Sequence, residues 1–130
     1  MKKKIILDCD PGHDDAVAIM LAVSCEKIEV LGITCVAGNT TLENTTLNAL
    51  KICSLIEKTD IPIYAGTNKP IFYDLVTASH VHGKSGLDIE GEQIKIKENY
   101  NIQSLNAVDF IIKTCLNQIE PIYICPTGPL

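Results

Sequence analysis

The sequence predicts an α/β protein with an open, mainly parallel, Rossmann-like sheet and helices on both faces. Short apolar runs rich in β-branched residues alternate with segments whose apolar residues recur at helical spacing. Polar or glycine-containing turns directly follow the apolar runs, as expected where parallel strands connect to crossover helices. The length of 130 residues and the hydrophobic content of 46% fit a single domain over residues 1–130.

The first predicted unit is a strand, a turn and a buried helix. The apolar run 4–7 forms the strand, which ends at Asp8. Pro11 and Gly12 bend the chain, and residues 16–23 are apolar on nearly every face of a helix. This helix is expected to be buried against the sheet.

The second unit repeats this order. Residues 28–37 are rich in β-branched side chains and predict a strand that stops at Gly38 and Asn39. Thr40 or Thr41 can cap the helix that follows. Four apolar residues share one face of that helix: Leu47, Leu50, Cys53 and Ile56.

The remainder adds two strands and one helix. Residues 61–65 predict a short strand, and residues 66–101 form a long loop without a sustained period. Apolar residues at spacings of 3 and 4 predict a helix over 105–116, followed by a strand at 122–125. Because long loops in compact domains are often functional, residues 66–101 are candidates for a binding role.

The charge balance points to a small-molecule partner. Eleven Lys and Arg against sixteen Asp and Glu give a net charge of −5, which disfavours a nucleic acid polymer or an anionic membrane surface as partner. No apolar stretch approaches the roughly 20 residues that cross a bilayer, and no export signal is visible. Six cysteines without a C-x-x-C pair predict free thiols in a reducing, cytoplasmic setting: Cys9, Cys25, Cys35, Cys53, Cys115 and Cys125.

Four acids follow the first strand closely: Asp8, Asp10, Asp14 and Asp15. Carboxylates this close repel one another and raise one another's pKa unless a cation intervenes. Oxygen ligands suit calcium or magnesium, and a flexible mixed set of carboxylates and carbonyls favours calcium. The alternative is that Asp14 and Asp15 complement the helix N-terminus while Asp8 faces solvent.

Polar residues also follow the other predicted strands. Asn39 follows the second strand, the loop with His80 and His82 follows the third, and Thr127 follows the fourth. The carboxyl ends of parallel strands share one sheet edge, where ligands bind in open α/β sheets. A functional site is therefore predicted at this edge.

Residues 8–16 read Asp-Cys-Asp-Pro-Gly-His-Asp-Asp-Ala, which resembles the D-x-D-P-G-x-D-D-A signature of the nucleoside hydrolase family, the inosine-uridine preferring ribohydrolases. Three further segments resemble this family in the expected order: 36–40, 82–87 and 126–130. The resemblance implies the nucleoside hydrolase fold and calcium-dependent cleavage between ribose and a purine or pyrimidine base. It also implies a homodimer or homotetramer.

The resemblance carries roles to individual residues. Asp10 is similar to the calcium ligand that also serves as general base, Asp15 to a second calcium ligand, and Thr127 to a ligand through its backbone carbonyl. Asp14 resembles the carboxylate that holds the ribose 2'-hydroxyl, and Asn39 the residue that orients sugar and water.

Two further residues belong to this comparison. His82 is similar to a residue beside the nucleobase, and Asp8 resembles a supporting position without an assigned role. Members of the family are more than twice this length, so the chain resembles their N-terminal portion. A fragment or truncated product is expected, with incomplete metal coordination and little turnover alone.

Two other functions compete with this one. Asp8 and Asp10 after an apolar strand also fit a haloacid-dehalogenase-like phosphatase, with a nucleophile and a general acid two residues apart. That family has Thr or Val where Gly12 stands, and leaves Asp14 and Asp15 without a role. The other alternative is a calcium- or ribose-binding remnant without catalysis. Release of ribose, of phosphate or of neither separates the three.

Overall fold

A computed structural model describes residues 2–88 and 93–129, apart from the side chain of His82. The four strands are all parallel, in the order β3-β2-β1-β4. This arrangement confirms the predicted α/β class. The elements are β1 (Lys3–Cys9), α1 (His13–Ser24), β2 (Ile28–Cys35), α2 (Leu42–Leu55), β3 (Ile63–Ala65), α3 (Ser79–His82), α4 (Ala107–Asn117) and β4 (Ile122–Pro126).

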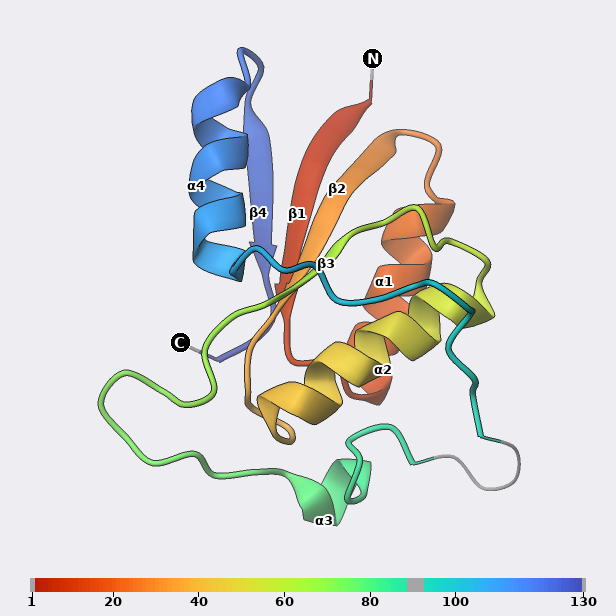
Figure 1. Cartoon of the computed structure of the whole chain (residues 1–130), viewed down its shortest axis with the longest axis vertical. Coiled ribbons are helices and arrows are strands. Elements are labelled where there is room, and N and C mark those ends of the chain that lie inside the picture. Colours follow the sequence, from red (N-terminus) through yellow and green to blue (C-terminus); the bar gives the residue numbers. More distant parts are fainter. Residues whose placement is uncertain (1, 89–92, 130) are drawn as a thin grey trace.

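Helices cover both faces of the sheet. α1 and α2 lie side by side on one face, and the main core fills the space between them and the strands (Figure 1). Ile19, Ile33 and Ile52 are at most 1% exposed in this core. On the opposite face, the ring of Phe110 from α4 stacks on Tyr64 with centroids 3.8 Å apart. Burial explains why β1 reads as a continuous apolar run, whereas β4 is equally apolar but is only partly covered.

Several element boundaries differ from the prediction, including the start of α1 at His13 rather than residue 16 and the end of β2 at Cys35 rather than residue 37. β3 begins at Ile63 rather than residue 61, because Pro62 has no N–H to donate to the ladder. α4 begins at Ala107, where the side chain of Asn106 accepts a hydrogen bond from the Val108 N–H at 2.8 Å. The predicted loop 66–101 contains the one-turn helix α3, which is too short to show a periodic pattern.

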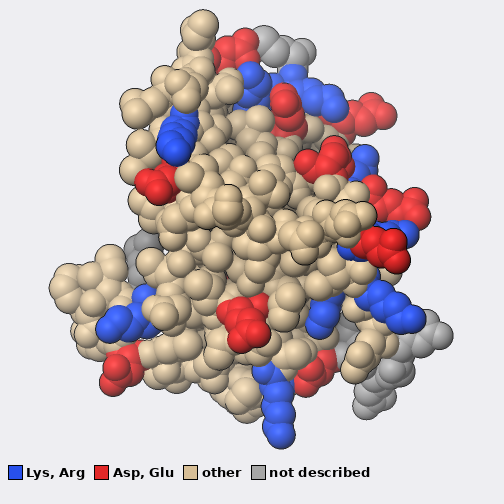
Figure 2. Space-filling view, in the orientation of Figure 1, with Lys and Arg blue, Asp and Glu red and all other residues tan. Residues whose placement is uncertain are grey.

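The surface of α4 and β4 remains partly apolar. Leu116 is 80% exposed and Tyr123 is 48% exposed. On the face shown in Figure 2, uncharged residues occupy the middle, and acidic and basic side chains are interspersed around the rim. All six cysteines are free thiols. Within the described ranges, no helix is long and apolar enough to span a membrane.

The path of the chain creates a crossover beside β1. From β1 the chain moves to β2 and β3 on one side, then returns through α4 to β4 on the other side of β1 (Figure 1). The carboxyl ends of β1 and β4 are therefore neighbours at a point where the strand order reverses. Open α/β sheets bind their ligands at such points.

Candidate active site

The turn after β1 carries two buried carboxylates. Asp10 is 7% exposed and Asp15, in the first turn of α1, is 4% exposed. The backbone N–H of Asp10 donates to Asp15 Oδ2 at 3.1 Å. Asp15 lies at the N-terminus of α1, where the positive end of the helix dipole attracts an acidic side chain. We call residues 10–12 the β1 turn.

Asn39, after β2, fixes Asp10 from the neighbouring strand. Its backbone N–H donates to Asp10 Oδ2 at 2.7 Å, and its side-chain Nδ2 donates to the carbonyl of Asp10 at 3.0 Å. Gly38 permits this approach, since a Cβ there would lie 2.2 Å from Asp10 Oδ2. The predicted proximity of Asn39 and Asp10 is thus present in the structure.

Thr127, after β4, completes the cluster. Its hydroxyl donates to Asp15 Oδ1 at 2.7 Å, and its backbone N–H donates to the carbonyl of Asp8 at 2.8 Å. Asp8 in turn accepts a hydrogen bond from the hydroxyl of Thr34 on β2. Asp8 therefore joins β1 to the ends of both neighbouring strands, which gives this residue a structural role. We call Asp10, Asp15, Asn39 and Thr127 the carboxylate cluster.

The pKa of Asp10 is raised from its usual 3.8 to about 6, chiefly by burial and also by the charges of Asp15 and Asp14, while the N–H of Asn39 opposes the shift. Both ion pairs found among the described residues lie elsewhere, on Lys4 and Lys97. The cluster holds two buried carboxylates, Asp10 and Asp15, with the charge of Asp14 close enough to act on Asp10.

The donor chemistry fits a hard cation in part. Asp10 and Asp15 offer carboxylate oxygens in a buried setting, which suits calcium or magnesium. Within residues 2–88 and 93–129, no three His, Cys, Asp or Glu side chains are grouped to hold a metal ion. The described part of the chain thus presents two carboxylates for such an ion, and calcium needs six to eight oxygens in total.

The other two residues that were predicted to bind substrate, Asp14 and His82, do not belong to the hydrogen-bonded cluster. Asp14 lies in the first turn of α1 with an exposed side chain, close enough for its charge to affect Asp10. His82 ends α3, and its side chain lies outside the described residues. The structure therefore brings four of the six predicted residues into one hydrogen-bonded cluster and leaves Asp14 beside it.

Sequence reasoning missed Asn48, a buried residue of α2. It is 1% exposed, and its Nδ2 donates to the carbonyl of Pro11 at 3.0 Å and to the carbonyl of Ser85 at 2.8 Å. Thr40 and Asn44 add hydrogen bonds to the carbonyl of Lys84 at 3.3 and 3.4 Å. We call residues 83–88 the loop turn.

The spacing of the polar residues that bond the loop turn can be recognised in the sequence. Asn44 and Asn48 are four residues apart, which places them on one side of α2, and Thr40 lies just before the N-cap residue Thr41. Asn is unfavourable inside helices because its side chain competes for backbone hydrogen bonds, so a buried Asn there indicates a specific partner. The identity of that partner was not readable, since Ser85 follows a long aperiodic segment.

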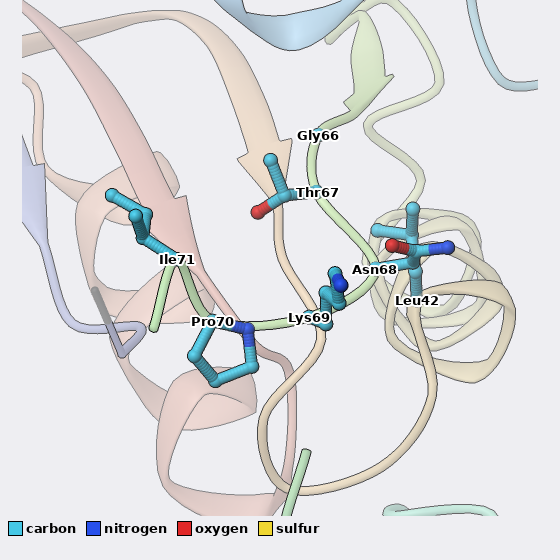
Figure 3. Close-up of a pocket in the computed structure, with 7 residues that line it drawn as sticks. All are labelled: Leu42, Gly66, Thr67, Asn68, Lys69, Pro70 and Ile71. Carbon is cyan, nitrogen blue, oxygen red and sulfur yellow. The ribbon is translucent and has the colours of Figure 1, made fainter. Parts of the chain in front are cut away.

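A separate pocket lies beyond the carboxyl end of β3. It has a volume of about 490 Å³ and is lined by Leu42 at the start of α2 and by residues 66–71 (Figure 3). The carbonyl of Thr67 accepts a hydrogen bond from the N–H of Ala37 at 3.0 Å, which ties its wall to the chain after β2. None of the predicted site residues lines this pocket.

Comparisons with known proteins agree with the motif analysis. The family model for inosine-uridine preferring nucleoside hydrolases matches residues 5–130. The chain is 44% identical over 129 residues to the pyrimidine-specific ribonucleoside hydrolase RihB of Escherichia coli strain K12. That match covers 99% of this chain and 40% of RihB.

Solved structures give the same result. The purine-preferring ribonucleoside hydrolase from Gardnerella vaginalis superimposes with a TM-score of 0.87 and 32% identity, covering 98% of this chain and 40% of that one. A plant nucleoside hydrolase gives a TM-score of 0.88 at 30% identity, covering 99% and 40%. Neither these proteins nor the family match favours the phosphatase alternative.

The chain thus spans about 40% of the length of the relatives it matches. Within that span, the family match agrees with the observed strand order and with the buried acids that follow β1. The chain belongs to the inosine-uridine preferring nucleoside hydrolase family.

Proposed function

We propose that this chain provides the carboxylate-bearing part of a calcium-dependent ribonucleoside hydrolase, which cleaves the N-glycosidic bond to give ribose and free base. The observation that carries the proposal is the carboxylate cluster, found at the crossover edge of the sheet in a member of this family. Because the relatives are longer, we propose that residues 1–130 are the N-terminal part of the catalytic domain.

In this proposal Asp10, Asp15 and the backbone carbonyl of Thr127 hold calcium. When bound, calcium supplies positive charge that balances the carboxylates and lowers the pKa of the attacking water. Asp10 is proposed to accept a proton from that water, because its carboxylate lies within the carboxylate cluster that would hold the ion. Asn39 holds Oδ2 of Asp10 in place and so directs the carboxylate.

The reaction joins the water oxygen to C1' of ribose while the bond from C1' to the base nitrogen breaks. The electron pair of that bond leaves with the base, and positive charge develops on the sugar. A site rich in carboxylates stabilises such charge. Asp14 is proposed to hold the ribose 2'-hydroxyl, Asn39 to orient the sugar, and His82 to lie beside the base.

The substrate class is a small nucleoside rather than a polymer. The relatives include a pyrimidine-specific and a purine-preferring enzyme, so both classes of base belong in the test. A cytoplasmic location and a homodimer or homotetramer complete the proposal.

The test measures release of reducing sugar from inosine and from uridine with calcium present. We expect Asp10→Asn to lower the rate by about 10² to 10⁴, the usual contribution of a general base. Asp60→Asn is the matched control, since Asp60 is exposed and precedes β3 at the opposite edge of the sheet. Equal release by wild type and Asp10→Asn would contradict the proposal.

The same experiment separates the alternatives. If no sugar is released, titration calorimetry with calcium decides whether the chain binds the ion and loses it in Asp10→Asn, as a non-catalytic remnant would. Phosphate release from a phosphate monoester, without ribose release from nucleosides, would support the phosphatase instead.

A further inference from the structure

We propose that Asn48 is a positioning residue that sets the distance between the carboxylate cluster and the loop turn. One amide nitrogen, Nδ2, donates to Pro11 in the β1 turn and to Ser85 in the loop turn. Pro11 directly follows Asp10, and the loop turn directly follows His82, the residue that is proposed to lie beside the base. The inference rests on the proposed function and deepens it.

Burial makes these two hydrogen bonds costly to lose. Asn48 is 1% exposed, and Ala49 and Ile52 of the same helix are core residues. A buried carbonyl without its partner pays the full cost of losing water. The two N–H groups of the amide are matched to two carbonyls, so no apolar side chain can replace Asn48 without leaving both unpaired.

Close packing of Gly86 against Thr40 and Asn48 also keeps the loop turn near α2. Gly86 is buried and has a φ of +80°, a conformation that side chains rarely adopt. A Cβ at Gly86 would lie 2.8 Å from Thr40 Cγ2 and 3.2 Å from Asn48 Nδ2. The loop turn therefore fits at this distance from α2 only because glycine occupies this position.

The loop turn also has hydrogen bonds of its own. The carboxylate of Asp88 accepts hydrogen bonds from the backbone N–H groups of Lys84 at 2.9 Å and Ser85 at 3.3 Å. The N–H of Gly86 donates to the carbonyl of Gly83 at 3.3 Å. The N–H groups of Lys84, Ser85 and Gly86 are thus bonded within the turn, while Asn48 bonds the turn to Pro11.

Hydrogen exchange of the whole chain, followed by mass spectrometry, tests the attachment without requiring catalysis. We expect Asn48→Leu to speed exchange in residues 83–88 at least tenfold while α1 stays protected. Thr46→Val is the matched control, because Thr46 is equally buried but its hydroxyl donates to carbonyls of its own helix. Unchanged exchange at 83–88 in Asn48→Leu would overturn the proposal, as would an equal increase in Thr46→Val.

A second variant approaches the same contact from the loop. Gly86→Ala leaves Asn48 in place and is expected to speed exchange at 83–88 by a similar factor. If Asn48→Leu does not fold, this variant decides, and normal protection of 83–88 in it would overturn the proposal.

The effect of the Asn48 attachment on substrate binding is measured as a change in KM. With inosine or uridine and calcium, we expect Asn48→Leu to raise KM at least tenfold, with a smaller change in kcat, while Thr46→Val leaves KM unchanged. An unchanged KM in Asn48→Leu would overturn the positioning role. If wild type hydrolyses neither nucleoside, as expected of the N-terminal part of a longer domain, calcium binding judges the proposed function, and the exchange experiment judges the link between Asn48, Pro11 and Ser85.

Discussion

The β1 turn and the loop turn meet at the same edge of the sheet but are held there by different means. The β1 turn is fixed by neighbours: the N–H of Asp10 donates to Asp15 five residues later, and Asn39 reaches it from the adjacent strand. The loop turn belongs to a long segment after β3 and is anchored by side chains of α2, chiefly Asn48. The position of the carboxylates is therefore set by the strands of the sheet. The position of the loop turn depends on side chains along one side of α2.

This difference has an energetic side. In the β1 turn the Asp10 carboxylate is buried, and its pKa is raised to about 6. Ionised Asp10 therefore destabilises the folded chain when no cation is bound. The loop turn buries the Asn48 amide with both donors matched, so it is stable without a ligand. Substitutions in the β1 turn should therefore exchange stability for ligand binding, whereas those at the loop attachment should lose both stability and substrate affinity.

The largest effect on stability is expected from Asp10→Asn without calcium. A pKa raised from 3.8 to about 6 means that the folded chain binds more protons than the unfolded chain between these values. Stability contributed by Asp10 is therefore highest at low pH and falls as pH rises through 6. Above pH 7 the cost is about 3 kcal/mol, and Asp10→Asn should remove most of it. Urea denaturation between pH 4 and 8 measures the difference.

Asp60→Asn serves as control, because an exposed carboxylate should change stability by less than about 0.5 kcal/mol at any of these pH values. Calcium should reduce the difference in unfolding free energy between Asp10→Asn and wild type, since only wild type is expected to bind the ion and be stabilised by it. A constant difference from pH 4 to 8 would show that burial of Asp10 carries no such cost.

Gly38→Ala should disturb the β1 turn next most strongly. The new Cβ would lie 2.2 Å from Asp10 Oδ2 and 2.8 Å from Pro129 Cγ, so the carboxylate must move. We expect a loss of about 1–3 kcal/mol in unfolding free energy, typical of overpacking, together with loss of calcium binding. Denaturation and calorimetry measure the two effects.

Gly66→Ala is the matched control at the same edge. Its Cβ would lie 2.8 Å from the carbonyl oxygen of Cys35, so it should also lower stability, but it lies away from the carboxylates. Loss of calcium binding in both variants would contradict a local role for Gly38.

The contrast between the two turns also explains what could be predicted from the sequence. The proximity of Asp10, Asp15 and Asn39 follows from strand order and short turns, because each residue lies within a few positions of a strand or helix end. The pairing of Asn48 with Ser85 depends on where a long segment returns, and no periodicity encodes that path. The short helix α3 was missed for the same reason.

Thr127→Val tests the bond that joins β4 to the carboxylate cluster. The Thr127 hydroxyl donates to Asp15 Oδ1 at 2.7 Å, and a hydrogen bond to a charged group is worth up to about 3 kcal/mol when buried. Because Thr127 is exposed, we expect about 1 kcal/mol and a several-fold weaker affinity for calcium, measured by calorimetry. Thr127→Ser keeps the hydroxyl and should restore both values. If Thr127→Val matched wild type, the hydroxyl would not orient Asp15.

The smallest effect is expected from Asn44→Ala, which weakens the loop attachment near its surface. Asn44 Nδ2 donates to Thr40 Oγ1 at 3.0 Å and to the carbonyl of Lys84 at 3.4 Å, and water can replace both bonds because Asn44 is only partly buried. We expect a stability change within about 0.5 kcal/mol and slightly faster exchange at 83–88. A cost equal to that of Asn48→Leu would mean that the loop turn is held by its whole contact with α2. The buried amide of Asn48 would then not be the main attachment of the loop turn. The β1 turn and the loop turn would differ only in how strongly they are held.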